Sequence, residues 1–209
     1  MPSTALERAR ALRAAPRAPL SELESQRYGE WLATQNFAEH TPRVNDLTRR
    51  PTRESISEDL ARLRDRLAAF GLAEREVTGD GNCQFRAISD QLYSDQEQHS
   101  LVRSMCIDQL LFAPERYRDY VVAEDYDDYV QNMSKTGEWG DNVTLQALSD
   151  YLNAEINLVT SFDSDGLVRV VPQPDSSAQG ARPQGNGSQS LFCSFWAEIH
   201  YQSIVMAGV

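Results

Sequence analysis

The spacing of apolar residues changes type along this chain, and that change limits the possible folds more than any other feature. From Ile56 to Leu152, apolar residues recur three and four positions apart, which is typical of amphipathic helices. Beyond that point, short β-rich runs alternate with turn residues. Helices first and strands later predict an α+β domain, with helices around a small central β-sheet.

Individual elements can be placed from their end signals. A helix is expected from a capping box at Ser55 and Glu58 to Phe70, with Gly71 as its stop. Further helices are predicted over 84–93, 99–112, 126–133 and from Asp141 or Asn142 to Leu152. An extended piece is predicted over 75–78, and strands over 156–162, 167–171, 191–196 and 200–205, of which the first two form a hairpin.

Two segments have the composition of linkers. Residues 1–53 are predicted to be an N-terminal extension that is partly disordered, with a short helix near Ser21 and a polar stretch over 40–53. The Arg/Ala-rich start suits a flexible leader, and a transit peptide is the alternative. Residues 172–190 hold three Pro and three Gly among Ser and Gln, which predicts a flexible insertion within a domain spanning 54–209.

Charge and cysteine content argue against several classes of protein. The net charge is −11, and the acidic excess lies after residue 53, which disfavours nucleic-acid binding and suits a basic protein partner. No run approaches the ~20 apolar residues that cross a bilayer, and no secretory signal is visible. Three cysteines without CxxC spacing predict free thiols, no zinc site, and a cytoplasmic or nuclear location.

One cysteine stands in a context that suits a nucleophile. The residues Gly79-Asp80-Gly81-Asn82 form a tight loop directly before Cys83, which starts a predicted helix. A helix N-terminus lowers a thiol pKa, and its N–H groups can bind an oxyanion. Among three histidines, His40 lies in a polar stretch and His99 starts a helix among polar residues, where we expect it at the surface. His200 is therefore the first choice of base, against the alternative of a buried structural thiol and a core histidine.

Three segments together resemble the motifs of the ovarian tumour (OTU) family of deubiquitinases. The segment Thr78-Gly79-Asp80-Gly81-Asn82-Cys83-Gln84-Phe85-Arg86-Ala87 is similar to the family's nucleophile motif. Gly137-Glu138-Trp139-Gly140-Asp141 with Thr144-Leu145-Gln146-Ala147 resembles its middle motif, and Trp196-Ala197-Glu198-Ile199-His200-Tyr201 its histidine motif. The resemblance implies a papain-like OTU fold and a thiol protease of the ubiquitin conjugation pathway, without a metal or organic cofactor.

The resemblance also implies roles for individual residues. Cys83 would be the nucleophile and His200 the general base and acid, while Asp80 lies in the loop that forms the oxyanion hole. Residues expected near the C-terminal tail of the substrate are Gly81, Asn82, Trp139, Gly140, Trp196 and Tyr201. For Trp139, a place in the core is the alternative.

The chain departs from the family at one position. Two residues after the histidine the family usually has Asn or Asp, which orients the imidazole, and here that residue is Gln202. Either Gln202 or Asp80 is expected to take this role. The resemblance implies a monomer that acts on ubiquitin or polyubiquitin, with no nucleic-acid or membrane partner. A weakly active ubiquitin-binding module and a protease for another ubiquitin-like modifier are the alternatives.

Overall fold

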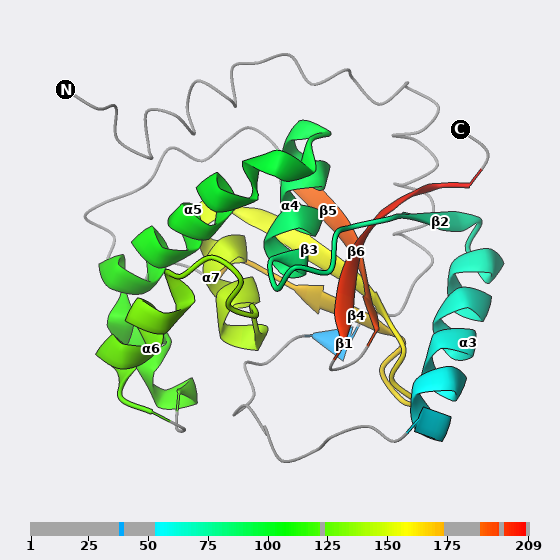
Figure 1. The fold of residues 1–209 in the computed structure, drawn as a ribbon, viewed down its shortest axis with the longest axis horizontal. Helices are drawn as coiled ribbons and strands as arrows, with labels where there is room; N and C mark the ends of the chain where they lie inside the picture. Colours follow the sequence, from blue (N-terminus) through cyan, green and yellow to red (C-terminus); the bar gives the residue numbers. More distant parts are fainter. Residues whose placement is uncertain (1–37, 40–52, 122–123, 174–188, 197–198, 208–209) are drawn as a thin grey trace.

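The computed structural model describes residues 38–39, 53–121, 124–173, 189–196 and 199–207. The predicted helix near Ser21, the polar stretch over 40–52 and most of the predicted insertion, from 174 to 188, lie outside these residues. The described residues form one sheet with helices on both of its faces (Figure 1). This arrangement confirms the expected α+β class.

The strands form a six-stranded mixed sheet in the order β1-β4-β3-β5-β6-β2. They are β1 (Ala38–Glu39), β2 (Leu72–Arg75), β3 (Ala154–Thr160), β4 (Leu167–Val170), β5 (Gln189–Trp196) and β6 (His200–Met206). Strands β3 and β4 pair antiparallel, which confirms the predicted hairpin, whereas β3 and β5 pair in parallel. Strand β6 lies between β5 and β2 and is antiparallel to both, so its first residues sit beside the exit of β2.

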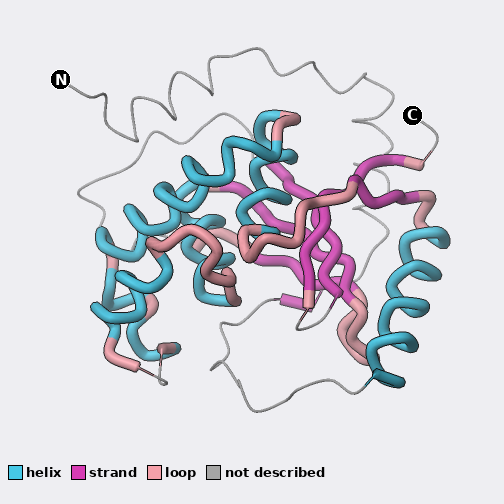
Figure 2. The backbone as a smooth tube through the Cα atoms, viewed as in Figure 1, coloured by secondary structure: helices cyan, strands magenta, loops and turns pink. Residues whose placement is uncertain are grey.

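The helices divide unequally between the two faces of the sheet (Figure 2). One side carries α4 (Cys83–Tyr93), α5 (His99–Phe112), α6 (Tyr126–Met133) and α7 (Asn142–Leu152). Three short 3-10 turns connect them: η1 (Gln96–Gln98), η2 (Pro114–Arg116) and η3 (Arg118–Tyr120). The other side carries α3 (Arg53–Ala69), which packs on β2, β3 and β5.

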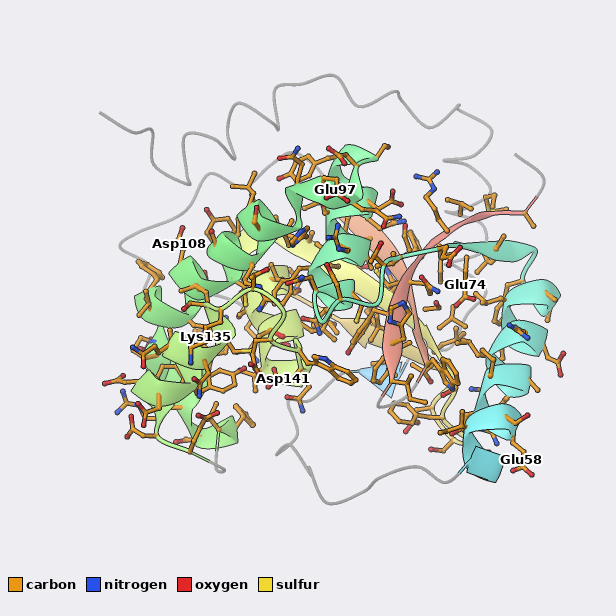
Figure 3. All side chains as sticks on the ribbon, viewed as in Figure 1. Glu58, Glu74, Glu97, Asp108, Lys135 and Asp141 are labelled. Atoms are coloured by element: carbon orange, nitrogen blue, oxygen red, sulfur yellow. The ribbon has the colours of Figure 1, made fainter. Side chains whose placement is uncertain are left out.

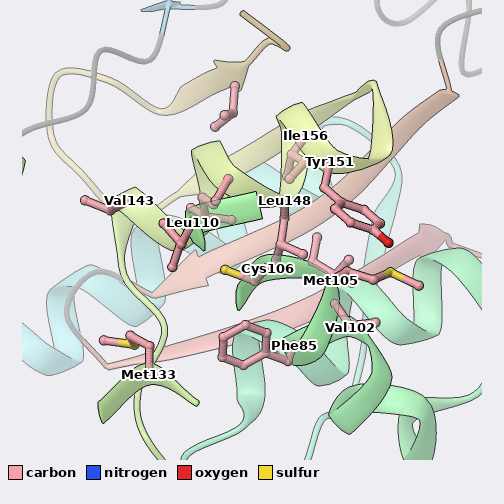
Figure 4. Close-up of a cluster of buried hydrophobic side chains, with 14 of the residues drawn as sticks. Phe85, Val102, Met105, Cys106, Leu110, Met133, Val143, Leu148, Tyr151 and Ile156 are labelled. Atoms are coloured by element: carbon pink, nitrogen blue, oxygen red, sulfur yellow. The ribbon is translucent and has the colours of Figure 1, made fainter. Parts of the chain in front are cut away.

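Side chains on the central strands alternate between two cores. On β3, Ile156 and Leu158 join the large core under α4 to α7, part of which Figure 4 shows, whereas Val159 joins the smaller core under α3. On β5, Leu191 faces the large core and Phe192 faces the small one. Successive residues of a strand point to opposite faces, so both faces of the sheet are buried, and the strands read as nearly continuous apolar runs.

Most predicted elements agree with the structure, and the differences lie at element ends. The helix predicted over 99–112 has these bounds in α5. Helix α3 begins at Arg53, so Ser55 lies inside it and is not its cap. Gly71 has φ +63° and ends that helix as expected. The extended piece begins three residues earlier than predicted, as β2, because Leu72 pairs with Met206 of β6.

The outside of the domain carries the acidic excess seen in the sequence. Glu58, Glu97 and Asp108 are exposed and lie around the periphery of the ribbon (Figure 3). Within the described ranges, no helix combines the length and the apolar character needed to cross a membrane.

Candidate active site

The loop between β2 and α4 is pressed against the segment that follows α6. Gly81 has φ +83°, which is in the left-handed region, and a Cβ atom there would lie 2.0 Å from the carbonyl oxygen of Gly137. Only glycine allows this backbone conformation and this approach together. The loop before Cys83 and the segment that carries Trp139 therefore form one unit.

A buried arginine links the β2–α4 loop to the segment that follows α6. Arg103 of α5 is 4% exposed and lies over the ring of Phe85, with 3.9 Å between its guanidinium carbon and the ring centroid. It donates hydrogen bonds to Asn82 Oδ1 at 2.8 Å, to Met133 O at 2.8 Å and to Glu138 O at 2.7 Å. A buried guanidinium needs such acceptors, so it holds both loops at fixed positions.

Cys83 stands at the start of α4, and His200 lies near enough for each of the two side chains to shift the pKa of the other. Burial alone raises the pKa of the Cys83 thiol, but the hydrogen bond and the charge of His200 outweigh it, together with the backbone N–H groups of Tyr201 and Gln84. The pKa of Cys83 therefore lies below its ordinary value. The same hydrogen bond is the main reason why the pKa of His200 is raised. These opposite shifts favour a thiolate–imidazolium pair.

The N-terminus of α4 is open. Asn82 is the N-cap residue, but its side chain makes no capping hydrogen bond to the helix. Its oxygen instead accepts from Arg103 and, at 2.9 Å, from the N–H of Gly137. The first N–H groups of a helix have no partner within the helix, and the N–H of Gln84 helps to lower the pKa of the Cys83 thiol.

Asp80 is committed to Arg86. Arg86 donates to the Asp80 carboxylate through Nη2 at 2.8 Å and Nε at 3.1 Å, and the Asn82 N–H donates to it at 3.0 Å. The hydrogen bond from Arg86 is the main reason why the pKa of Asp80 lies far below its usual range. Among the described residues the carboxylate makes no hydrogen bond to His200, which argues against Asp80 as the direct partner of the imidazole.

The far side of the imidazole meets the backbone of the β2–α4 loop. His200 Nε2 lies 3.1 Å from the carbonyl oxygen of Val77. A carbonyl only accepts, so Nε2 carries a proton and Nδ1 remains for the sulfur of Cys83. Gln202 Oε1 accepts from the N–H of Val77 at 2.5 Å, and Gln202 also makes a small contribution to the raised pKa of His200.

Comparison with known proteins finds relatives of this chain in one family. Residues 78–182 match the model of a protein family described as OTU-like cysteine protease. The chain is 42% identical over 165 residues to ovarian tumor domain-containing deubiquitinating enzyme 12 of Arabidopsis thaliana, covering 79% of this chain and 69% of that protein. It is 39% identical to enzyme 11 of the same plant, covering 91% and 74%.

The chain belongs to the OTU family. Its match spans 45% of the longer deubiquitinating enzyme 9 of Arabidopsis thaliana, somewhat less than half of that relative. Among solved structures, the OTU domain of OTUD1 superposes with a TM-score of 0.56 at 19% identity, covering 73% of this chain and 97% of that one. This likeness confirms the predicted OTU fold.

The residues expected near the substrate have different surroundings in this OTU domain. Trp139 is 59% exposed, so the alternative of a core aromatic is wrong. Gly140 packs on Gln84, whose Oε1 would lie 2.2 Å from a Cβ at position 140. Trp196 packs on the core under α3 and is partly buried. Gly81 lies in the β2–α4 loop, two residues before Cys83.

Two of the expected contacts need correction. The side chain of Asn82 is 4% exposed and points inward to Arg103, because the buried cation requires its oxygen. Tyr201 is 7% exposed, and its ring stacks on Phe195 with 4.4 Å between centroids. Tyr201 acts on Cys83 through its backbone N–H. The side chains of Asn82 and Tyr201 both point inward, so neither is placed to bind a substrate.

Sequence reasoning missed Arg103 and Val77. Arg103 falls on the apolar face of α5, in line with Cys106, Ile107 and Leu110, and a cation in such a row is a usable signal. Val77 acts through its backbone, for which no side-chain pattern exists. His99 was expected at the surface, but it is half-buried, and its Nδ1 has no hydrogen-bond partner in the described part of the chain. Burial lowers its pKa.

No group of three His, Cys, Asp or Glu residues that could hold a metal ion occurs among the described residues. Cys106 and Cys193 are free and buried, and burial raises the pKa of both thiols far above the usual range. Of the three cysteines, only Cys83 has a lowered pKa and partial access to solvent. The chemistry of the site therefore centres on Cys83.

Proposed function

We propose that this chain is a cysteine-type deubiquitinase that hydrolyses isopeptide bonds after the C-terminal glycine of ubiquitin. The observation that carries the proposal is the pairing of Cys83 with His200 at the N-terminus of α4, where the pKa of the thiol is lowered and that of the imidazole is raised. The names of the two Arabidopsis relatives support the choice of ubiquitin as the modifier. Residues 54–209 would be the catalytic domain and residues 1–53 an N-terminal extension, since α3 packs on the sheet through Leu63 and Leu67.

The acylation step uses the thiolate and the imidazolium. The sulfur of Cys83 attacks the glycine carbonyl carbon, a C–S bond forms, and the oxygen becomes an oxyanion. As the intermediate collapses, the C–N bond breaks and His200 gives its proton to the leaving lysine amine. The products of this step are a free lysine side chain and a thioester between ubiquitin and Cys83.

The deacylation step reverses the role of His200. Neutral His200 takes a proton from water, whose oxygen attacks the thioester carbonyl. The C–S bond then breaks and the thiolate–imidazolium pair is restored, while the released carboxylic acid of ubiquitin loses its proton to solvent and becomes the carboxylate. The reaction consumes one water and needs no metal or organic cofactor.

The surroundings of Cys83 supply the other functions. The N–H of Cys83 and the loop amides near Asp80 would bind the oxyanion, because the side chain of the N-cap residue Asn82 does not cap α4. A narrow path past Gly81, Gly140 and the exposed Trp139 would admit a tail of two glycines and exclude bulkier ones. Trp196, beside His200, is the candidate for the other wall.

The surface and the thiols suggest the setting of the reaction. The acidic excess of residues 54–209 suits the docking of a basic protein surface and disfavours nucleic acid. A lowered thiol pKa makes Cys83 prone to oxidation, which suits a reducing compartment such as the cytoplasm or nucleus. We propose that the protein acts there as a monomer on ubiquitin or polyubiquitin, without a membrane partner.

A ubiquitin probe with a C-terminal electrophile tests the proposal. The protein should form a covalent adduct with the probe that is lost in Cys83→Ala and kept in Cys193→Ala, since Cys193 is buried. Mass spectrometry of the adduct identifies the modified thiol. No adduct in the native protein, with reversible binding of ubiquitin, would instead indicate a binding module. Faster reaction with a probe built on a ubiquitin-like protein would indicate a different modifier.

A further inference from the structure

We infer that the backbone carbonyl of Val77 orients His200, and that Gln202 acts chiefly as a positioning residue by holding Val77 in place. The inference rests on the proposed function, in which His200 is the general base. It assigns the orienting role to a peptide group in the β2–α4 loop. The main partner of Gln202 is then the N–H of Val77 and not the imidazole.

The strand register explains why Gln202 reaches Val77. In the β2–β6 pair, Arg75 stands opposite Ser203, and β2 ends there. The next pair would place residue 76 opposite Gln202, but the chain leaves the sheet at this point to reach Cys83. The side chain of Gln202 extends across the gap, and its Oε1 takes the N–H of Val77 at 2.5 Å. This side-chain oxygen takes the place of a backbone acceptor at the point where the hydrogen bonds between β2 and β6 end.

Val77 is held on three sides. Its side chain is 3% exposed and belongs to the large core, its N–H donates to Gln202, and its carbonyl accepts from His200. With the side chain and the N–H fixed, only rotation about ψ can turn the carbonyl away from the imidazole. An acceptor restrained in this way orients the ring without further loss of conformational freedom.

A carbonyl also suits the task chemically. It cannot donate, so it selects the tautomer with the proton on Nε2, whereas a free amide side chain can present either end. The Val77 N–H selects the oxygen end of the Gln202 amide. The carboxylate of Asp80, the other candidate, is bound to Arg86 and the Asn82 N–H. Cys83 has the largest effect on the pKa of His200 and raises it, whereas burial lowers it. The Val77 carbonyl and Gln202 raise this pKa further, by smaller amounts.

Amide-to-ester replacement at Thr78 tests the carbonyl directly. A hydroxy acid at this position turns the Val77 amide carbonyl into an ester carbonyl, which is a weaker acceptor, and leaves every side chain unchanged. We expect kcat on a fluorogenic ubiquitin substrate to fall about tenfold, as for one weakened hydrogen bond to a charged group. The falling limb of the pH profile should move to lower pH, because the imidazolium loses stabilisation.

A hydroxy acid at Gln96 is the matched control. It weakens the Asp95 carbonyl, which accepts from Ser89 Oγ at 2.5 Å beyond the other end of α4. This protein should keep its kcat and pH profile. An unchanged kcat and an unchanged falling limb in the Thr78 ester would overturn the role of Val77.

Variants at Gln202 test whether this side chain holds Val77 in place. Gln202→Met keeps the length of the side chain but has no acceptor for the Val77 N–H, so kcat should fall about fivefold, with the same direction of shift in the falling limb. Gln202→Glu keeps an acceptor and should restore most of the activity. Equal kcat values and pH profiles for native protein and Gln202→Met would refute the role of Gln202 in holding Val77. If the ester protein does not fold, this variant still tests the inference.

Alkylation of Cys83 by iodoacetamide separates this inference from the proposed function. The pH dependence of the alkylation rate measures the titration of the thiolate–imidazolium pair in the absence of ubiquitin. The effects of the ester and of Gln202→Met can therefore be measured even if the protein does not act on ubiquitin. Native protein that fails to react with the ubiquitin probe would refute the proposed function alone. Alkylation profiles that do not respond to either change would refute the role of Val77 alone.

Discussion

Helices α4 and α7 have the same length, eleven residues each, but their N-termini are built in opposite ways. At α7, the Asp141 carboxylate accepts from the N–H groups of Val143 and Thr144, and Thr144 Oγ1 accepts from the N–H of Asp141, which forms a capping box. At α4, the cap residue Asn82 turns away from the helix. A cap stabilises a helix by about 1 kcal/mol, so α4 forgoes that stability, and in the proposed mechanism its amides bind the thiolate and the oxyanion.

The closed terminus supports the open one. Gln84, in the first turn of α4, donates to the carbonyl oxygen of Asp141 at 2.9 Å and accepts from Thr144 Oγ1 at 2.7 Å. Both partners belong to the capping box of α7. The difference teaches that an uncapped helix start remains in a fixed position when a neighbouring capped helix holds its side chains.

The largest effect is expected from His200→Gln, which leaves the start of α4 intact and removes the imidazole. We expect kcat on the fluorogenic ubiquitin substrate to fall about 10³-fold or more, because nucleophile and base act as a unit. In the native protein, the profile of kcat/KM should rise below the ordinary thiol pKa and fall above the ordinary imidazole pKa, since the first is lowered and the second raised.

Alkylation by iodoacetamide shows what the helix terminus does alone. In His200→Gln the rising limb should move to higher pH, towards the ordinary thiol value, because the strongest stabiliser of the thiolate is gone. A rising limb that stays in place would mean that the open start of α4 suffices to hold the thiolate.

Glycines in the two loops that precede these helices should differ in their sensitivity. Gly81→Ala places a Cβ against the backbone oxygen of Gly137 at a positive φ, so both loops must move. We expect a loss of about 2–4 kcal/mol in the free energy of unfolding and about 10² in kcat/KM. Urea denaturation and turnover of the ubiquitin substrate measure the two effects.

Gly140→Ala is the matched control for Gly81→Ala. Its Cβ meets the Gln84 side chain and not backbone, and Gly140 has no positive φ; displacing Gln84 would cost its two hydrogen bonds to the start of α7, about 1–2 kcal/mol. Losses of equal size at the two positions would show that the start of α7 is as constrained as the start of α4.

The smallest effect on activity is expected at the closed terminus. Asp141→Ala removes the cap of α7 and should lower the free energy of unfolding by about 1–2 kcal/mol, with kcat changed less than about threefold. Asp141→Asn, which keeps a capping oxygen, should recover most of the stability. A kcat reduced by more than tenfold in a protein of native stability would contradict the division between a structural and a catalytic helix start.

The sequence by itself determined the local structure and pointed to Cys83 and His200 as the proposed reacting pair. The bounds of α5 and the end of α3 at Gly71 follow from periodicity and end signals, which act over a few residues. For the cap of α7 these signals left Asp141 and Asn142 open, and the structure shows Asp141. The choice of Cys83 and His200 followed from the loop before α4 and from the small number of histidines. Asn82 was misread, because its partner Arg103 lies 21 positions away on α5.

Only the tertiary structure decided how the pair is oriented. The contacts of Val77 with His200 and Gln202 join residues 123 and 125 positions apart, and they exist because β6 lies beside the exit of β2. The parallel pairing of β3 with β5 likewise depends on partners that no local pattern specifies. Hydrogen bonds between distant backbone groups depend on the register of the sheet, and a sequence pattern records which faces are apolar but not which strands meet.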